Sequence, residues 1–370
     1  MNAPQPFRVA LTADFYEADG RLKYREIGLD LLADHPQLQF DRIAEHRPEI
    51  EPEQLQNVNG AIVLAPRVTA GSLSASEELL AIGRFGVGFD SVDVAACTDA
   101  DVLLFITAGA VDYSVAEATV GWMLALSHHL RVKDRLVREA RWQDRSQYMG
   151  SELRQRTLGI VGFGGIGRMV ARLLAGFDMQ RPLVFDPFAS AAEVVEQGAR
   201  LVPLDELLAT ADYVSLHCPL NEQTRDLIGA RELALMKPTA CLINTARGGI
   251  VNEDALYEVL SERRIAGAAI DCFVGEPLTA PPRVAQLDNV LLAPHCIAWT
   301  DELFRDIGRA ACQGMIDLVE GRRPNGVVNP EVFDRPGFQA KWERLRSSSA
   351  WQRTRKHIRS FGGHRENQPP

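Results

Sequence analysis

Residues 157–186 read TLGIVGFGGIGRMVARLLAGFDMQRPLVFD, and this stretch determines the fold of the chain. It opens with a short apolar run at 158–161, which predicts a buried parallel strand. Three glycines follow in the order G-x-G-x-x-G. Apolar residues then recur at helical spacing, and a second apolar run at 183–185 ends on Asp186. The order strand, glycine loop, helix, strand and acid predicts a dinucleotide-binding βαβ unit rather than a glycine-rich turn of an unrelated α/β protein.

Each conspicuous residue of this unit has a physical task. Gly162 permits the tight turn off the strand, Gly164 lets a pyrophosphate approach the backbone, and Gly167 lets the helix pack closely on the strand. The helix N-terminus offers unpaired N–H groups to the phosphates. Asp186 follows Gly167 by 19 residues, where a carboxylate accepts hydrogen bonds from a ribose diol. Because that carboxylate would repel a 2′-phosphate, and Pro187 rather than a basic residue follows it, we predict NAD over NADP.

Length, charge and cysteine usage narrow the class of protein. A chain of 370 residues suits two domains, and a net charge of −9 argues against a nucleic-acid partner for the body of the protein. The six cysteines show no C-x-x-C spacing, which favours free thiols over disulfides or a zinc site. The N-terminus lacks a secretory signal pattern, and no apolar run reaches the ~18 residues of a membrane span. We therefore expect a cytoplasmic protein without a structural metal.

The rest of the chain predicts alternating strands and helices. Residues 7–108 form a small α/β unit with strands at 8–12 and 61–65, a helix over 73–82 and a strand ending at 85. A long helix is predicted over 116–130 and another over 300–320. After the glycine loop, strands are predicted at 213–217, 241–245, 268–271 and 290–293, with helices at 204–210, 230–236 and 253–263. This rhythm predicts two doubly wound parallel-sheet domains, a Rossmann domain inserted in a smaller flavodoxin-like one.

The expected domain boundaries follow from this pattern. Residues 1–108 and 299–335 form a discontinuous substrate-binding domain, and residues 109–298 form the cofactor domain. Residues 336–370 are expected to be a basic, partly helical and poorly ordered tail, because 341–370 carry eight Lys and Arg against two Asp and Glu.

Three polar residues follow predicted strand ends, where ligands bind in a doubly wound sheet. Arg247 lies in NTARGG (244–249), Glu276 in DCFVGEP (271–277) and His295 in APHCIA (293–298). A guanidinium binds a carboxylate in a bidentate manner. An imidazole transfers a proton near neutral pH, and a neighbouring carboxylate orients it. The set suits hydride transfer between a nicotinamide and a 2-hydroxy acid, although each residue alone is more often structural or solvated.

These segments together resemble the D-isomer-specific 2-hydroxyacid dehydrogenase family over roughly residues 55–330. The resemblance lies in GVGFDSVD (86–93), VAEATVGWMLAL (115–126), GIVGFGGIGR (159–168), HCPLNEQTRDLI (217–228), LINTARGGIVNEDAL (242–256), GAAIDCFVGEPL (267–278) and LAPH (292–295).

The resemblance implies NAD as cofactor, a small anionic substrate and a set of site residues. It implies Arg247 as the substrate-carboxylate binder, His295 as general acid and base, and Glu276 as its partner. Backbone groups of Val87 and Gly88 would hold the substrate carboxylate as well. It also implies a homodimer formed through the cofactor domain. Further implied cofactor contacts are Gly165, Ile166, Cys218, Pro219, Thr224, Thr245, Ala246 and Asp271.

Some alternatives stay open at this point. Trp299 either walls the substrate pocket or packs structurally, and Arg67 either faces a second anionic group or is an exposed loop residue. No regulatory domain follows residue 330, which disfavours an allosterically controlled phosphoglycerate dehydrogenase. The same scaffold could oxidise another anion such as phosphite, whereas Glu276 argues against formate. A dinucleotide-sensing protein like the corepressor relatives is a third hypothesis.

Overall fold

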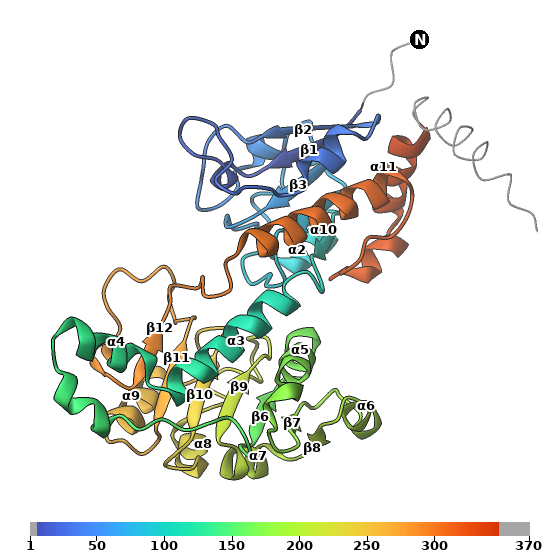
Figure 1. Cartoon of the computed structure of the whole chain (residues 1–370). Helices are drawn as coiled ribbons and strands as arrows, with labels where there is room; N and C mark the ends of the chain where they lie inside the picture. The colour runs from blue at the N-terminus through green and yellow to red at the C-terminus, as the bar shows by residue number, and fades with distance from the viewer. Residues whose placement is uncertain (1–5, 348–370) are drawn as a thin grey trace, which may run out of the picture. The chain divides into compact units, whose positions relative to one another are not determined.

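The computed structural model describes residues 6–347, which divide into two compact units (Figure 1). Unit 1 contains the described residues up to Val111 and from Thr300 onward, and unit 2 is Asp112–Trp299. Unit 2 is therefore an insertion within the chain of unit 1. Each unit is built on one parallel sheet covered by helices, which confirms the predicted α/β fold class.

Unit 1 has a five-stranded parallel sheet in the order β2-β1-β3-β4-β5. Its strands are β1 (Phe7–Leu11), β2 (Leu38–Arg42), β3 (Gly60–Val63), β4 (Ala81–Arg84) and β5 (Leu103–Ile106). Its helices are α1 (Leu29–Ala33), α2 (Val94–Asp99), α10 (Asp301–Val319) and α11 (Pro336–Ser347).

Helix α10 packs on this sheet at glycine positions. A Cβ on Gly314 would lie 2.3 Å from the Phe105 ring, and one on Gly83 would lie 2.6 Å from the same ring. A Cβ on Gly60 would lie 2.7 Å from the sulfur of Met315. The late segment of the chain therefore completes the core of unit 1, with Met315 fully buried.

Unit 2 has a seven-stranded parallel sheet in the order β12-β11-β10-β9-β6-β7-β8. Its strands are β6 (Leu158–Val161), β7 (Leu183–Phe185), β8 (Arg200–Leu201), β9 (Tyr213–Leu216), β10 (Cys241–Asn244), β11 (Gly267–Ile270) and β12 (Val290–Leu292). Its helices are α3 (Asp112–Ser127), α4 (Leu130–Arg138), α5 (Gly165–Leu173), α6 (Ala191–Glu196), α7 (Leu204–Thr210), α8 (Ala230–Leu235) and α9 (Glu253–Ser261).

Alternate residues of the central strands build the two faces of this sheet. Leu158 and Ile160 of β6 join the cluster that contains Met123 of α3 and Val170 of α5. Val161 joins the opposite cluster with the buried residues of α7, α8 and α9. The order of strands reverses at β6, between β7 and β9, so the carboxyl ends of β6 and β9 form the switch point where ligands of such sheets bind.

In the N-terminal part of unit 1, the structure corrects one expectation and adds two strands. The helix predicted over 73–82 is absent: residues 71–78 form turns, and Leu79 and Leu80 lead directly into β4. The reason is local, because Ser76 Oγ donates to the Leu73 carbonyl (2.6 Å) and Ser74 Oγ to the Gly71 carbonyl (2.9 Å), bonds that compete with a helix. Strands β2 and β5 were not predicted.

The C-terminal segment also differs from the expected tail. Residues 336–347 form α11, in which Phe338 is fully buried and Trp342 Nε1 donates to the Leu318 carbonyl (2.9 Å). Lys341 Nζ donates to the Ala100 carbonyl (2.8 Å). The predicted tail is therefore wrong over 336–347, where the chain forms a helix that packs on unit 1 through Phe338. The remainder of the expected tail, 348–370, lies outside the described residues.

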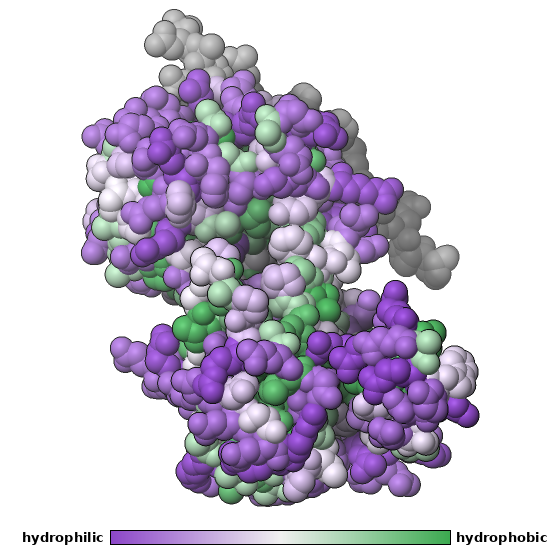
Figure 2. Space-filling model, turned by 90° about the vertical axis from the view of Figure 1, so that its left-hand side faces the viewer, coloured by the Kyte–Doolittle hydropathy of each residue, from purple (hydrophilic) through white to green (hydrophobic). Residues whose placement is uncertain are grey.

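Within residues 6–347, no helix has the length and apolarity to cross a bilayer. On the face shown in Figure 2, hydrophilic residues cover most of each unit, and apolar ones form small patches. All six cysteines are free thiols.

Candidate active site

The glycine loop has the shape that a dinucleotide requires. Gly162 has a φ of +92°, and a Cβ there would lie 2.7 Å from the amide nitrogen of Cys218. A Cβ on Gly167 would lie 2.4 Å from the Gly162 carbonyl oxygen, so α5 packs directly on the loop. Nothing lies within 4 Å of a Cβ on Gly164, which faces open space beside the N-terminus of α5. Packing within the chain therefore explains two glycines, while the third leaves room for a ligand.

Asp186 is tied to the same loop from the end of β7. Its Oδ2 accepts from the Phe163 N–H (2.7 Å) and its Oδ1 from the Phe188 N–H (2.8 Å). These bonds fix the carboxylate next to the glycine loop, where it remains partly exposed. This placement fits a carboxylate that binds a ribose diol beside a pyrophosphate.

The loop after β9 lies at the switch point, on the side of β6 opposite β7. Thr224 Oγ1 donates to the Pro219 carbonyl (2.6 Å) and accepts from the Asn221 N–H (2.8 Å), which makes residues 219–224 a compact turn. Cys218 lies directly against Gly162. Burial raises the pKa of the Cys218 thiol to about 11, so it stays protonated near neutral pH.

The loop after β10 presents Arg247. Asn244, the last residue of the strand, accepts from the Ala246 N–H (3.0 Å) through its Oδ1 and donates to the Arg247 carbonyl (2.9 Å) through its Nδ2. A Cβ on Gly248 would lie 2.1 Å from both the carbonyl carbon and the oxygen of Phe273. Glycine at 248 is therefore what lets this loop contact the one that follows β11.

Asp271 organises the segment that carries His295. The Asp271 carbonyl accepts from the His295 N–H (2.8 Å), and its Oδ1 accepts from the N–H groups of Cys296 (2.9 Å) and Ile297 (3.2 Å). Burial raises the pKa of Asp271 despite these bonds. His295 itself has a left-handed φ of +53°. Asp271 thus holds the His295 N–H through its main-chain carbonyl and the two residues after the histidine through its buried carboxylate.

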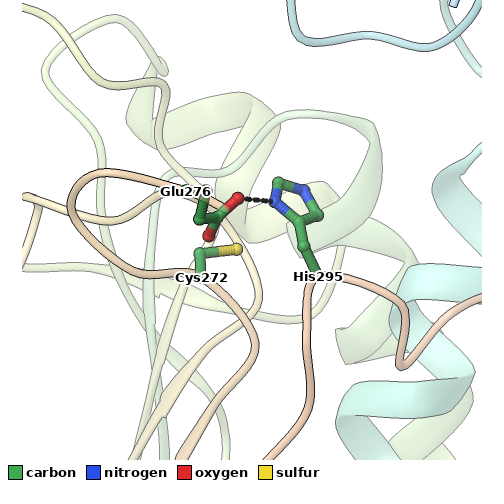
Figure 3. A group of neighbouring side chains, drawn as sticks. All are labelled: Cys272, Glu276 and His295. Carbon is green, nitrogen blue, oxygen red and sulfur yellow. Dashed lines mark hydrogen bonds and ion pairs between the residues drawn. The ribbon is translucent and has the colours of Figure 1, made fainter. Parts of the chain in front are cut away.

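Glu276 and His295 form a hydrogen-bonded pair (Figure 3). His295 Nδ1 and Glu276 Oε2 are 2.7 Å apart, and Glu276 Oε1 accepts from the Phe273 N–H (2.6 Å). Burial alone would raise the pKa of Glu276, but the bonds from His295 and Phe273 outweigh burial and lower it, helped by the nearby Arg247 charge. Glu276 is therefore an ionised carboxylate at neutral pH. With Nδ1 bound to it, Nε2 is the ring nitrogen that can serve a substrate.

Cys272 lies beside this pair, and the three donor atoms of Cys272, Glu276 and His295 are within 4.8 Å of one another (Figure 3). Such a set could hold a metal ion. The contacts of these side chains argue against a metal site, because both Glu276 oxygens already accept hydrogen bonds and burial raises the pKa of the Cys272 thiol. Cys272 Sγ instead donates to the Ala246 carbonyl (3.3 Å), at the base of Arg247.

The structure thus brings Arg247, Glu276 and His295 to one edge of the unit 2 sheet, on the loops after β10, β11 and β12. Thr245 is buried, and its Oγ1 lies 3.3 Å from Oγ1 of Thr119, so its side chain packs against α3. Val87 and Gly88 lie in unit 1, after β4.

Sequence reasoning missed Asn244 and Gly248, which shape the Arg247 loop. A strand-ending Asn is a local signal for such a turn. The contact made by Gly248 has no local signal.

The fold and this site define a dinucleotide-binding α/β protein of the dehydrogenase type, and comparison with known proteins gives the family. A profile of the D-isomer specific 2-hydroxyacid dehydrogenase NAD binding domain matches residues 120–296. A glyoxylate reductase of Korarchaeum cryptofilum is 34% identical over 323 residues, which cover 85% of this chain and 96% of that protein. The chain belongs to the D-isomer specific 2-hydroxyacid dehydrogenase family and has its NAD-binding domain, as the sequence motifs predicted.

Two further relatives extend this comparison. A D-3-phosphoglycerate dehydrogenase of Synechocystis sp. is 34% identical over 321 residues, which cover 84% of this chain and 56% of that protein. The chain thus spans about half the length of the phosphoglycerate dehydrogenases that it matches. The structure of D-lactate dehydrogenase from Aquifex aeolicus, complexed with NAD and lactic acid, superposes with a TM-score of 0.70 at 27% identity. That match covers 85% of this chain and 96% of the other.

Proposed function

We propose that the chain is an NAD-dependent oxidoreductase that interconverts a D-2-hydroxy acid and its 2-keto acid. The observation that carries this proposal is the 2.7 Å pairing of His295 with Glu276 at the edge of a sheet whose glycine loop fits a dinucleotide. Family membership supports the same reaction type.

The proton has a defined route in this proposal. A dinucleotide held by the glycine loop and Asp186 would supply the hydride for the carbonyl carbon of a keto acid, or accept one from the alcohol carbon. His295 Nε2 gives a proton to the carbonyl oxygen during reduction and takes it from the hydroxyl during oxidation. Glu276 keeps the ring oriented through Nδ1 and stabilises the imidazolium. Acid–base assistance of this kind is worth about 10²- to 10⁴-fold in rate.

Arg247 is the proposed partner of the substrate carboxylate. A guanidinium offers two parallel N–H groups that match a carboxylate, so it fixes the substrate in orientation as well as in place. Asn244 and Gly248 set the loop from which Arg247 projects. In this proposal, unit 1 is the substrate-binding domain.

Asp186 defines the proposed choice of cofactor. Because both of its oxygens already accept backbone N–H groups, the carboxylate is held in place at the proposed ribose position. A 2′-phosphate would meet that charge directly, which favours NAD over NADP.

We also infer a cytoplasmic homodimer through unit 2. Large apolar side chains are exposed on α4 and the segment after it: Leu130, Val137, Trp142 and Met149, the last at 80% exposure. Clustered exposed apolar groups of this kind mark a protein interface. Sedimentation of the wild type and of Trp142→Ser checks this inference, because a monomer in both would contradict it.

The activity is tested by following NADH oxidation with a panel of 2-keto acids that includes glyoxylate, pyruvate, branched and aromatic keto acids and a phosphorylated keto acid. The expected result is turnover with at least one member and its loss in His295→Ala. NADH binding by the wild type without turnover across the panel would instead favour a dinucleotide-sensing protein.

A further inference from the structure

Asp112, the first residue of α3, places a carboxylate against the N-terminus of α5. Helices α3 and α5 pack side by side (Figure 1). A Cβ built on Gly165, the first residue of α5, would lie 1.9 Å from Asp112 Oδ2 and 2.6 Å from its Cγ. The carboxylate therefore lies directly on the Gly165 backbone, and this contact explains why residue 165 is glycine.

No charged side chain among the described residues pairs with this carboxylate. Within residues 6–347, no ion pair or hydrogen bond to its side chain is found, and burial is the one influence that raises its pKa. Half-burying an unpaired carboxylate costs free energy, which the positive end of α5 offsets only in part. The absence of a pairing partner among the described residues suggests a functional reason for this carboxylate.

The N-terminus of α5 is also the place for the cofactor pyrophosphate. The N–H groups of the first turn and the open space in front of Gly164 suit the phosphates. A pyrophosphate bound there would lie within one helical turn of the Asp112 carboxylate. Two anions would then compete for the same positive helix end.

We propose that Asp112 weakens the binding of the dinucleotide by opposing its pyrophosphate, and so accelerates its release. This inference rests on the proposed NAD site. It assigns to Asp112 a role in setting cofactor affinity, separate from the chemistry of His295. Since charges near a helix terminus are felt mainly within the first turn, replacing this one carboxylate should change affinity by about 5- to 30-fold.

The test compares wild type with Asp112→Asn and Asp112→Ser, using NADH fluorescence and calorimetry with ADP-ribose and with adenosine. Both variants should bind NADH and ADP-ribose about 5- to 30-fold more tightly, with slower NADH release in stopped flow. The gain should shrink between 0.05 and 0.5 M salt because the effect is electrostatic. Adenosine, which lacks the pyrophosphate, should bind equally to all three proteins.

Glu117→Gln is the matched control, because it removes an exposed carboxylate from the same helix without touching Gly165. It should leave the Kd for NADH within about twofold. Unchanged or weaker NADH binding by both Asp112 variants, folded as judged by thermal melting, would overturn the inference while leaving the proposed function intact. Failure of the wild type itself to bind NADH and ADP-ribose would overturn both.

Discussion

The pairing of Glu276 with His295 makes a quantitative prediction. Glu276→Gln keeps an acceptor oxygen for the Phe273 N–H but replaces the carboxylate that faces Nδ1 with a neutral amide. A hydrogen bond to a charged group contributes about 1.5–3 kcal/mol. Because the Glu276 side chain is 32% exposed, solvent screening places the value in the lower half of that range.

About 1.4 kcal/mol is a factor of ten in rate, so kcat/KM should fall about 10- to 50-fold in Glu276→Gln. His295→Ala should cost about 10²- to 10⁴-fold. The assay is steady-state turnover in both directions at one pH, where kcat/KM must fall by the same factor each way because the overall equilibrium is unchanged.

The double variant Glu276→Gln/His295→Ala shows whether Glu276 acts through the His295 imidazole. If it does, Glu276→Gln should add little to His295→Ala, since groups that act as a unit are strongly non-additive. Multiplicative losses in the double variant would refute this reasoning. Glu253→Gln is the control: Glu253 Oε1 accepts from the Val274 N–H (2.7 Å) in the same loop but contacts no imidazole, so kcat/KM should stay within about twofold.

Three further predictions concern packing, cofactor choice and pH. Gly248→Ala should lower the free energy of unfolding by about 1–3 kcal/mol and reduce turnover, because its Cβ would overlap the Phe273 carbonyl. The control in thermal melts is Gly121→Ala on α3, where a Cβ meets nothing within 4 Å. Asp186→Ala should weaken NADH binding about tenfold and narrow the preference over NADPH, so titrations in which the two Kd values keep their wild-type ratio would contradict the role of this carboxylate. The folded pKa of Glu276 is lowered, so its contribution to stability is complete above the unfolded carboxyl value of about 4.3 and is lost as pH falls through the lower folded value. The difference in Tm between wild type and Glu276→Gln should accordingly be constant from pH 5 to 7 and shrink below pH 4, and a difference that grows on acidification would show the opposite sign.

Local sequence signals predicted the cofactor unit well because it is built from local rules. The order of β6, the glycine loop, α5 and β7 is written in 30 consecutive residues, and Asp186 could be placed from spacing alone. In contrast, β2 (LQFDR) has only two apolar residues and so gives a weak strand signal. Strand β5 (LLFI) is as apolar as β6, and nothing in its sequence explains why it was missed. The serine-rich segment before β4 has apolar residues at helical spacing, yet its hydroxyls bind nearby carbonyls and produce turns.

The sequence could predict the candidate site only through the rule that the carboxyl ends of parallel strands lie at the same edge of the sheet. The positions of Arg247, Glu276 and His295 after strand ends predicted that the three residues lie close together. The structure adds the 2.7 Å hydrogen bond between Glu276 and His295. The supports could not be inferred in the same way. Gly248 matters because of the Phe273 backbone, and Gly165 because of Asp112, which lies 53 positions earlier. Such requirements come from tertiary contacts that spacing does not encode.

The insertion of unit 2 within unit 1 has a consequence for synthesis on the ribosome. All strands and helices of unit 2 have been translated once residue 299 is made, whereas the sheet of unit 1 still lacks α10, whose Gly314 and Met315 pack against β5, β4 and β3. During synthesis, the sheet of unit 1 therefore lacks the helix that covers one of its faces at a stage when unit 2 can already fold. Ribosome-stalled chains that are just long enough to expose residue 299 outside the exit tunnel should show protease protection of unit 2 before unit 1, although unit 1 begins first in the sequence.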